Sequence, residues 1–262
     1  MPSPIASTPV EATIIARRSL LAGTAGVLGP TVVIDTFRAF TTAAYLLDRG
    51  VAHIVLTETL DEARSRARGL PDALLCGEDG GRRPDDFDLG NSPTEVAAFP
   101  DLAERIVVMR TSGGTRTIVR ALRSGADPVY AASLVVAGAT VDAIRHFRHI
   151  TIIATGLGGT SIADEDEETG DLISDRILER ADDPHRIDRI RSGAGTRRLE
   201  STPWIDPADV LHCLDIDRFD FALRSLIIDG VPMLRAERRP HPSATRRNDP
   251  QMGSRLPGTA PI

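Results

Sequence analysis

The sequence predicts an α/β protein, a three-layer α/β/α sandwich with a mostly parallel, mixed sheet. Short apolar runs alternate with longer segments of helical composition, as parallel strands alternate with crossover helices. The apolar runs are hydrophobic on nearly every residue, which is typical of strands that are buried on both faces. Near the C-terminus, Asp229-Gly230 separates two further apolar runs and predicts a β-hairpin, which adds an antiparallel piece.

The elements follow from this alternation in chain order. Strands are expected at residues 31–35, 53–58, 73–78, 105–110, 128–133 and 149–156. Helices are expected at residues 38–49, 60–68, 114–122, 138–147 and 164–180, and Ser92-Pro93 marks one more helix start. The hairpin pairs 223–228 with 231–235, which completes a single domain over 1–238. Residues 239–262 are rich in Pro, Arg, Ser and Thr, and we predict a disordered tail there.

The N-terminal segment has a second interpretation. Arg17-Arg18 precedes an apolar stretch, which is similar to a twin-arginine export signal. That stretch runs without a break into the strand at 31–35, so cleavage would remove part of the sheet. We therefore interpret the segment as a strand and turn of the domain and expect a cytoplasmic protein. No apolar run reaches the about 18–20 residues of a membrane-spanning helix, so no membrane partner is expected.

Composition excludes several classes of function. The chain has 262 residues and a formal net charge of −6, whereas nucleic-acid binders normally carry a basic surface. It has no lysine, which excludes a lysine nucleophile and a lysine-dependent phosphate loop. Two cysteines are too few for a disulfide scaffold or a four-cysteine zinc site.

Polar residues follow the ends of predicted strands, where parallel sheets bind their ligands. Asp35 closes the strand at 31–35 and Arg38 begins the next helix. A carboxylate there can hold a divalent metal, and a guanidinium can bind a phosphate. Glu78 ends another strand and begins a glycine-rich loop, whose N–H groups can converge on an anion. The structural alternatives are a helix cap, a surface ion pair and a plain long loop.

Two further segments have the same ambiguity. Ser112-Gly113-Gly114-Thr115 opens a helix, and its free N–H groups and the helix dipole would attract an anion, although a plain tight turn has the same composition. The acidic run 164–168 opens another helix, where its carboxylates complement the helix dipole. One or two of these carboxylates could instead turn inward and complete a metal site.

Taken in order, these segments resemble the 2-phosphosulfolactate phosphatase family, also called the ComB-like family. The resemblance spans roughly residues 31 to 234. It rests on Val-Val-Ile-Asp-x-x-Arg-Ala around Asp35, Gly-Glu-x-Gly-Gly at 77–81, Asp-Leu-Gly-Asn-Ser-Pro at 88–93, Gly-Thr-Arg at 114–116, Glu-Asp at 165–166 and Asp-Ile-Asp-Arg-Phe-Asp-Phe-Ala at 215–222. The motifs at 77–81 and 88–93 are together the most specific part of the resemblance.

The resemblance implies an α/β/α fold and a Mg²⁺-dependent phosphoric monoester hydrolase. In this family the reaction converts 2-phosphosulfolactate into sulfolactate and phosphate, a step towards coenzyme M. We therefore expect a small anionic phosphorylated metabolite as substrate. The expected catalytic residues are Asp35, Arg38 and Glu78, the expected metal ligands are Asp35, Glu78, Glu165 and Asp166, and the expected substrate-binding residues are Asn91, Ser92, Ser112, Gly113, Gly114 and Thr115. Arg38 and the N–H groups of 113–115 are expected to stabilise charge on the phosphoryl oxygens.

The chain departs from the family pattern at three places. Gly113 stands where the family commonly has Asn, Thr169 stands where it commonly has Cys, and the Cys that the family has in the strand near Ala154 is absent. These departures motivate an alternative, a catalytically inactive relative that binds a phosphorylated or sulfonated metabolite. Another metal-using enzyme, such as a nucleotide hydrolase, is a further alternative. The sequence leaves open the attacking group and the oligomeric state, with a homodimer as one candidate.

Overall fold

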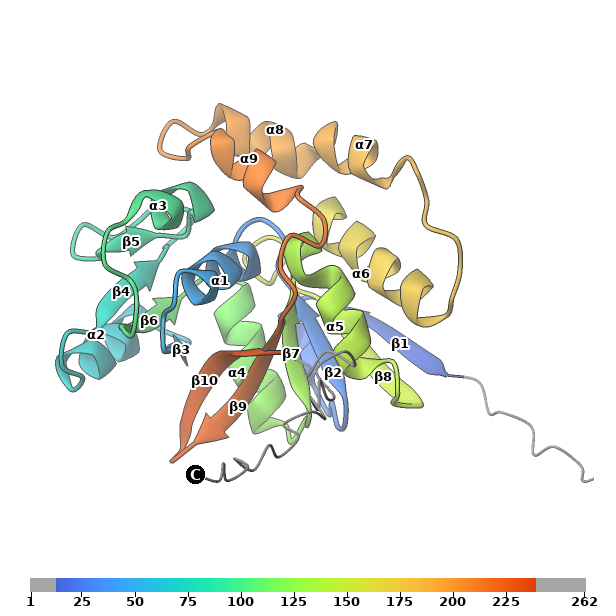
Figure 1. The fold of residues 1–262 in the computed structure, drawn as a ribbon, viewed down its shortest axis with the longest axis horizontal. Helices are drawn as coiled ribbons and strands as arrows, with labels where there is room; N and C mark the ends of the chain where they lie inside the picture. Colours follow the sequence, from blue (N-terminus) through green and yellow to red (C-terminus); the bar gives the residue numbers. More distant parts are fainter. Residues whose placement is uncertain (1–12, 239–262) are drawn as a thin grey trace, which may run out of the picture.

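The computed structural model describes residues 13–238, and Figure 1 shows how they are arranged. These residues form a mixed, mostly parallel ten-stranded sheet flanked by helices, which confirms the predicted fold class. The strands are β1 Ile14–Ser19, β2 Thr31–Ile34, β3 His53–Thr57, β4 Leu74–Gly77, β5 Leu89–Gly90, β6 Ile106–Arg110, β7 Val129–Ala132, β8 His149–Ala154, β9 Ala222–Ile228 and β10 Val231–Glu237. The tail predicted at 239–262 lies outside the described residues.

The α-helices of this part of the chain include every helix that the alternating pattern predicted, with ends shifted by up to three residues. They are α1 Ala39–Asp48, α2 Leu60–Arg68, α3 Pro93–Ala98, α4 Gly114–Arg123, α5 Ala137–Ile144, α6 Asp164–Ile177, α7 Arg186–Arg191, α8 Ala194–Ser201 and α9 Ala208–Cys213. Helices α7, α8 and α9 were not predicted, because each is only six to eight residues long. None of the helices in residues 13–238 is long and apolar enough to cross a bilayer.

The sheet consists of two parallel halves joined by the C-terminal hairpin, in the order β1-β8-β2-β7-β9-β10-β3-β6-β4-β5. Strands β1, β8, β2 and β7 are mutually parallel, as are β3, β6, β4 and β5. Between them, β9 pairs antiparallel with β7, and β10 pairs antiparallel with β9 and β3. Asp229 and Gly230 form the predicted turn, and both have positive φ, as a two-residue hairpin turn requires.

Sheet twist explains how the two halves share one site. The antiparallel steps make the halves run in opposite directions along the sheet. Adjacent strands rotate by about 20–25°, so the six steps from β2 to β4 add roughly 120–150° and offset most of this reversal. The C-terminal ends of β2 and β4 therefore face the same cleft, in which Asp35 and Glu78 both lie.

Helices cover both faces of the sheet. In β2, Val33 packs into the core that contains residues of α1 and α4, whereas Val32 and Ile34 pack into the core that contains residues of α5 and α6. In β3, Ile54 joins the first of these cores and Val55 packs beside α2. Because α4 contacts strands of both halves, one inner core connects them. This arrangement is the expected three-layer α/β/α sandwich.

The N-terminal segment is part of the sheet. Residues Ile14–Ser19 form β1, which pairs in parallel with β8 at the edge of the sheet, and a short 3-10 helix follows at Leu21–Thr24. This arrangement confirms the interpretation of the twin-arginine segment as a strand and turn. Arg17 points to α6, where it forms an ion pair with Glu167 at 2.8 Å.

Candidate active site

A cleft with a volume of about 420 Å³ opens where β2, β4, β6 and β8 end. Segments far apart in the chain form its lining, together with the start of α6 and part of α8. The predicted site residues that line it are Asp35, Arg38, Glu78, Asn91, Ser112, Gly113, Glu165 and Asp166. The structure therefore brings most of the predicted site together at one edge of the sheet. The others, Ser92, Gly114 and Thr115, lie behind the lining.

Asp35 lies at the starts of two helices. Its Oδ1 accepts a hydrogen bond from the Ala39 N–H group at 3.2 Å. Its Oδ2 faces the start of α4, where an added Cβ would come within 3.1 Å of it at Gly113 and within 2.9 Å at Gly114. A side chain at Gly114 would therefore press on the carboxylate. Burial, together with the negative charges of Glu78 and Glu165, raises the pKa of Asp35 to about 6.

Glu78 joins the loops that follow β4 and β6. Its Oε1 accepts from the Ser112 N–H group at 2.5 Å, and its Oε2 accepts from the Gly81 N–H group at 2.7 Å and from the Ser112 hydroxyl at 3.0 Å. The preceding residue, Gly77, has a φ of 143°, and an added Cβ would lie 1.8 Å from the carbonyl oxygen of Arg110. Glycine is required at this position because the two strand ends approach so closely.

Asp166 ties the ends of β2 and β8 to α6. Its Oδ1 accepts from the Thr36 N–H group at 2.7 Å, and its Oδ2 accepts from the Gly156 N–H group at 2.8 Å and the Thr155 hydroxyl at 3.2 Å. Burial raises the pKa of Asp166 well above its usual range, and the negative charge of Asp35 adds to that rise.

Glu165 is buried beside Asp166 and lies against the start of α8. A Cβ added to Gly195 would come within 2.3 Å of its Oε2, so the helix and the carboxylate are in close contact. Burial raises the pKa of Glu165, and the positive charge of Arg198 opposes that rise.

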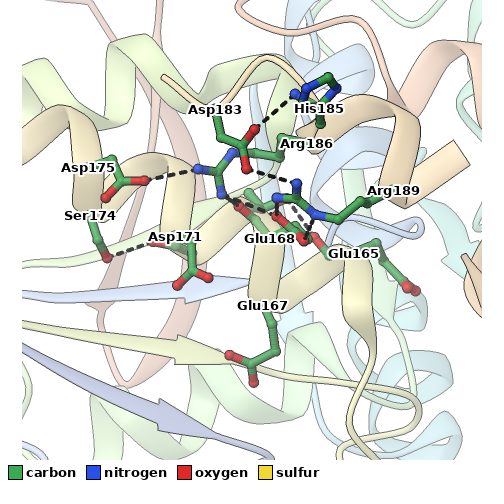
Figure 2. Close-up of polar contacts among 12 residues, drawn as sticks. Glu165, Glu167, Glu168, Asp171, Ser174, Asp175, Asp183, His185, Arg186 and Arg189 are labelled. Carbon is green, nitrogen blue, oxygen red and sulfur yellow. Dashed lines mark hydrogen bonds and ion pairs between the residues drawn. The ribbon is translucent and has the colours of Figure 1, made fainter. Parts of the chain in front are cut away.

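The acidic run 164–168 therefore divides between two environments. Glu165 and Asp166 turn into the cleft, as we expected for one or two of these residues. Glu167 pairs with an arginine of β1, and Glu168 pairs with two arginines of α7. Figure 2 shows that Glu168 lies within a network of polar contacts between α6 and α7. Glu167 and Glu168 thus stabilise the packing of α6 against its neighbours, whereas Glu165 and Asp166 line the cleft.

Arg38 is held by a residue that the sequence did not single out. Its Nη1 donates to Oδ2 of Asp209 on α9 at 2.5 Å. The other oxygen of Asp209 accepts from the Ser92 hydroxyl at 2.7 Å and from the Thr94 N–H group at 3.1 Å. Ser92 also accepts from the Glu95 N–H group at 3.2 Å, so it caps α3 as predicted. No local signal identifies Asp209, because its partner Arg38 lies 171 residues away in the chain.

Two of the N–H groups at 113–115, where we expect a phosphate to bind, lie against groups of the protein itself. The N–H group of Gly114 faces the Asp35 carboxylate and favours its ionised form. The N–H group of Thr115 bonds to the Thr111 hydroxyl at 3.1 Å, and the Thr115 hydroxyl donates to the Thr111 carbonyl at 3.1 Å. A helix start next to a strand end does attract an anion. Here that anion is a carboxylate of the protein itself.

The donor set of the cleft fits a partly hydrated Mg²⁺ ion. The lining carries four carboxylates (Asp35, Glu78, Glu165 and Asp166) and two guanidiniums (Arg38 and Arg198), so acidic groups exceed basic ones by two. Asn91 is buried and supplies a further oxygen, Oδ1, which has no hydrogen-bond partner. Among residues 13–238, no three acidic, histidine or cysteine side chains form a ready metal cage. Mg²⁺ commonly takes only one or two protein carboxylates and keeps several waters.

Comparison with known proteins points to one family. The sequence profile described as 2-phosphosulpholactate phosphatase matches residues 21–204, more than half of the chain. A probable 2-phosphosulfolactate phosphatase from Synechococcus sp. (strain JA-3-3Ab) is 31% identical over 216 residues, which cover 74% of this chain and 87% of that protein. Proteins of the same name from Deinococcus radiodurans and Thermus thermophilus are 42% and 38% identical over 47% and 51% of this chain. These two matches span only about half of each relative, 48% and 56% of its length.

Proposed function

The chain belongs to the 2-phosphosulpholactate phosphatase family, and from that premise we propose that it is a Mg²⁺-dependent phosphoric monoester hydrolase. The proposed substrate is a small anionic phosphomonoester, 2-phosphosulfolactate, and the products are sulfolactate and phosphate. The observation that carries the proposal is the excess of carboxylates in a cleft at the ends of the parallel strands. These carboxylates would repel a phosphate ester, whereas a bound divalent cation would bring the lining close to neutral.

Asp35 and Glu78 are the proposed principal Mg²⁺ ligands, directly or through water, and Glu165 and Asp166 are further oxygen donors. Backbone N–H groups already orient Asp35, Glu78 and Asp166, so these carboxylates need little rearrangement to receive a cation. When bound, Mg²⁺ would polarise the phosphoryl group and neutralise charge that develops on its oxygens.

Arg38 is the proposed contact to the phosphoryl oxygens. Asp209 holds its Nη1, whereas its Nη2 makes only a 3.5 Å contact with the carbonyl oxygen of Gly81. A guanidinium fixed at one end can direct its remaining N–H groups at an anion without losing further side-chain entropy. Asn91 lines the same cleft, and its side chain is available to orient the ester.

A phosphate-release screen over phosphorylated small acids tests this function. We expect the purified protein to release phosphate from 2-phosphosulfolactate in Mg²⁺, and to lose this activity in EDTA and regain it when excess Mg²⁺ is added. Tight binding of the ester with no release under any divalent metal would instead support an inactive, metabolite-binding relative. Preferred release from nucleotides would support a different metal-using hydrolase.

A further inference from the structure

Arg198 lines the cleft and has no role in the chemistry described above. It lies on α8 and is partly buried. The other arginine of the lining, Arg38, is held by Asp209 at 2.5 Å. In the part of the chain that the structure describes, Arg198 forms no ion pair, and it acts on Glu165 only through longer-range attraction. Its positive charge is therefore available to a ligand.

The helix that carries Arg198 is firmly placed. Leu199 is buried, and the buried Thr196 hydroxyl donates to the carbonyl of Ile190 on α7 at 2.7 Å. The preceding helix α7 is joined to α6 by ion pairs of the buried Arg186 with Glu168 at 3.3 Å and with Asp175 at 2.9 Å. Figure 2 shows the contacts of Arg186 with Glu168 and Asp175. The backbone of Arg198 is thus well positioned, although its guanidinium forms no ion pair with an acid among residues 13–238.

The lining of the cleft also contains apolar side chains beside its charged groups. Phe37, Leu157, Leu199 and Ile205 contribute apolar side chains to the lining. A charged phosphoryl group gains nothing from contact with these apolar side chains, whereas the short carbon skeleton of an organic ester can pack against them. The volume of about 420 Å³ also exceeds what a phosphate ion needs, so it can accept a small organic ester.

We propose that Arg198 is a specificity-determining residue that binds one of the two anionic groups that the substrate carries besides its phosphoryl group, the sulfonate or the carboxylate. This inference rests on the proposed function, because it names the contact that distinguishes such an ester from a simple phosphomonoester. The planar guanidinium offers paired N–H donors, which match the oxygen pairs of either group. The phosphoryl group would bind at the strand ends, with Arg38, and the sulfonate or the carboxylate would bind at α8.

The test compares Arg198→Ala with wild type and with Arg197→Ala. Arg197 is the adjacent residue on α8 and is exposed, and its side chain donates to the carbonyl of Ser192. The substrates are 2-phosphosulfolactate, 2-phospholactate, which lacks the sulfonate, and isopropyl phosphate, which lacks both extra anions. We expect Arg198→Ala to lower kcat/KM for 2-phosphosulfolactate by about 10- to 100-fold, mainly through KM, because one charge-assisted contact is lost. Its kcat/KM for isopropyl phosphate, and all values for Arg197→Ala, should remain at the wild-type level.

The second substrate identifies the anion. A loss on 2-phospholactate as large as on 2-phosphosulfolactate assigns Arg198 to the carboxylate, and no loss assigns it to the sulfonate. Equal losses on all three esters, or no loss on any, would overturn the proposal.

Titration calorimetry with sulfolactate separates this inference from the proposed function. If the wild type releases no phosphate from any ester, the proposed function fails. Weaker sulfolactate binding by Arg198→Ala than by wild type and Arg197→Ala would still support the inference in that case. Absence of sulfolactate binding to the wild type, or equal binding by all three proteins, would overturn it.

Discussion

The cleft and the α6–α7 interface both contain many carboxylates, but they compensate the negative charge differently. At the interface, Glu168, Asp175 and Asp183 pair with Arg186 or Arg189, at distances of 2.6–3.3 Å (Figure 2). In the cleft, Asp35, Glu78 and Asp166 accept hydrogen bonds from backbone N–H groups and form no ion pair with an arginine among residues 13–238.

Helix α6 belongs to both regions, so the difference does not come from local composition. Glu165 and Asp166 face the cleft, and Glu167 and Glu168 face arginines. A guanidinium neutralises a carboxylate, whereas N–H dipoles orient it and leave its charge for another cation. The partner of an acidic residue, rather than its presence in a run, therefore indicates whether it stabilises the fold or binds a ligand. Four predictions test this distinction, from the largest expected effect to the smallest.

Asp35→Asn should reduce Mg²⁺-dependent phosphate release by about 10²- to 10³-fold, because it removes a preorganised charge from the cleft. Steady-state release from 2-phosphosulfolactate measures the effect. The matched control is Asp175→Asn, which changes a carboxylate of the interface and should leave kcat near the wild-type value. Full activity in Asp35→Asn would remove Asp35 from the mechanism.

Arg186→Ala should lower the free energy of unfolding by about 3 kcal/mol, because it removes a buried guanidinium from between two carboxylates. Urea denaturation measures this change. Arg180→Ala serves as the control: its side chain is 65% exposed and pairs with Asp175 at 3.6 Å, so its loss should cost at most about 0.5 kcal/mol. Equal losses would mean that burial does not distinguish the two arginines.

The metal-free protein should lose stability as the pH rises from about 4 to 6. Because the pKa of Asp35 is about 6 in the fold and ordinarily 3.8, the folded protein binds more protons than the unfolded chain in this window. Asp35→Asn should reduce that dependence and gain up to about 3 kcal/mol at pH 7, with little gain at pH 4. The raised pKa values of Glu165 and Asp166 account for the dependence that remains. Thermal denaturation in EDTA measures both proteins. Added Mg²⁺ should then raise the Tm of the wild type but not that of the variant.

If the stability of the two proteins changed with pH in the same way, Asp35 would not have the raised pKa that its burial implies. A Tm that Mg²⁺ raises equally in both would show that the ion binds elsewhere.

Glu165→Gln and Glu168→Gln should produce small shifts of opposite sign. Burial raises the pKa of Glu165, so its charge is unfavourable at pH 7 and its removal should raise the Tm slightly. Glu168 pairs with Arg186 and Arg189, so its neutralisation should cost about 1 kcal/mol. Scanning calorimetry of both variants in EDTA checks this. Shifts of the same sign would contradict the distinction between Glu165, which lines the cleft, and Glu168, which pairs with arginines.

The segments of the site could be predicted because their signals are local. Asp35 and Glu78 each follow an apolar run, and Ser92-Pro93 marks a helix start within a few residues. Parallel strands present their C-terminal ends on one edge of a sheet, which is why we expected these residues to converge. In the structure Asp35 and Glu78 follow strands of opposite halves, and the twist of the sheet brings them to one cleft. The partners of the N–H groups at 114 and 115 could not be predicted for a complementary reason. Glycine-rich turns attract anions, but local sequence does not show that a carboxylate of the same chain will occupy the turn.

The sequence by itself determined the α/β class, the strand ends and the acidic and arginine residues available there, because these depend on hydrophobic period and on neighbours within one turn or strand. Only the tertiary structure decided which arginine, N–H group or ligand each acidic side chain faces. Asp209 reaches Arg38 across 171 residues, and Glu165 and Glu168 diverge within one helix turn. The physical reason is that charge compensation depends on distance in space. That distance is set by the accumulated twist of ten strands and by the placement of α7, α8 and α9, which no local pattern records.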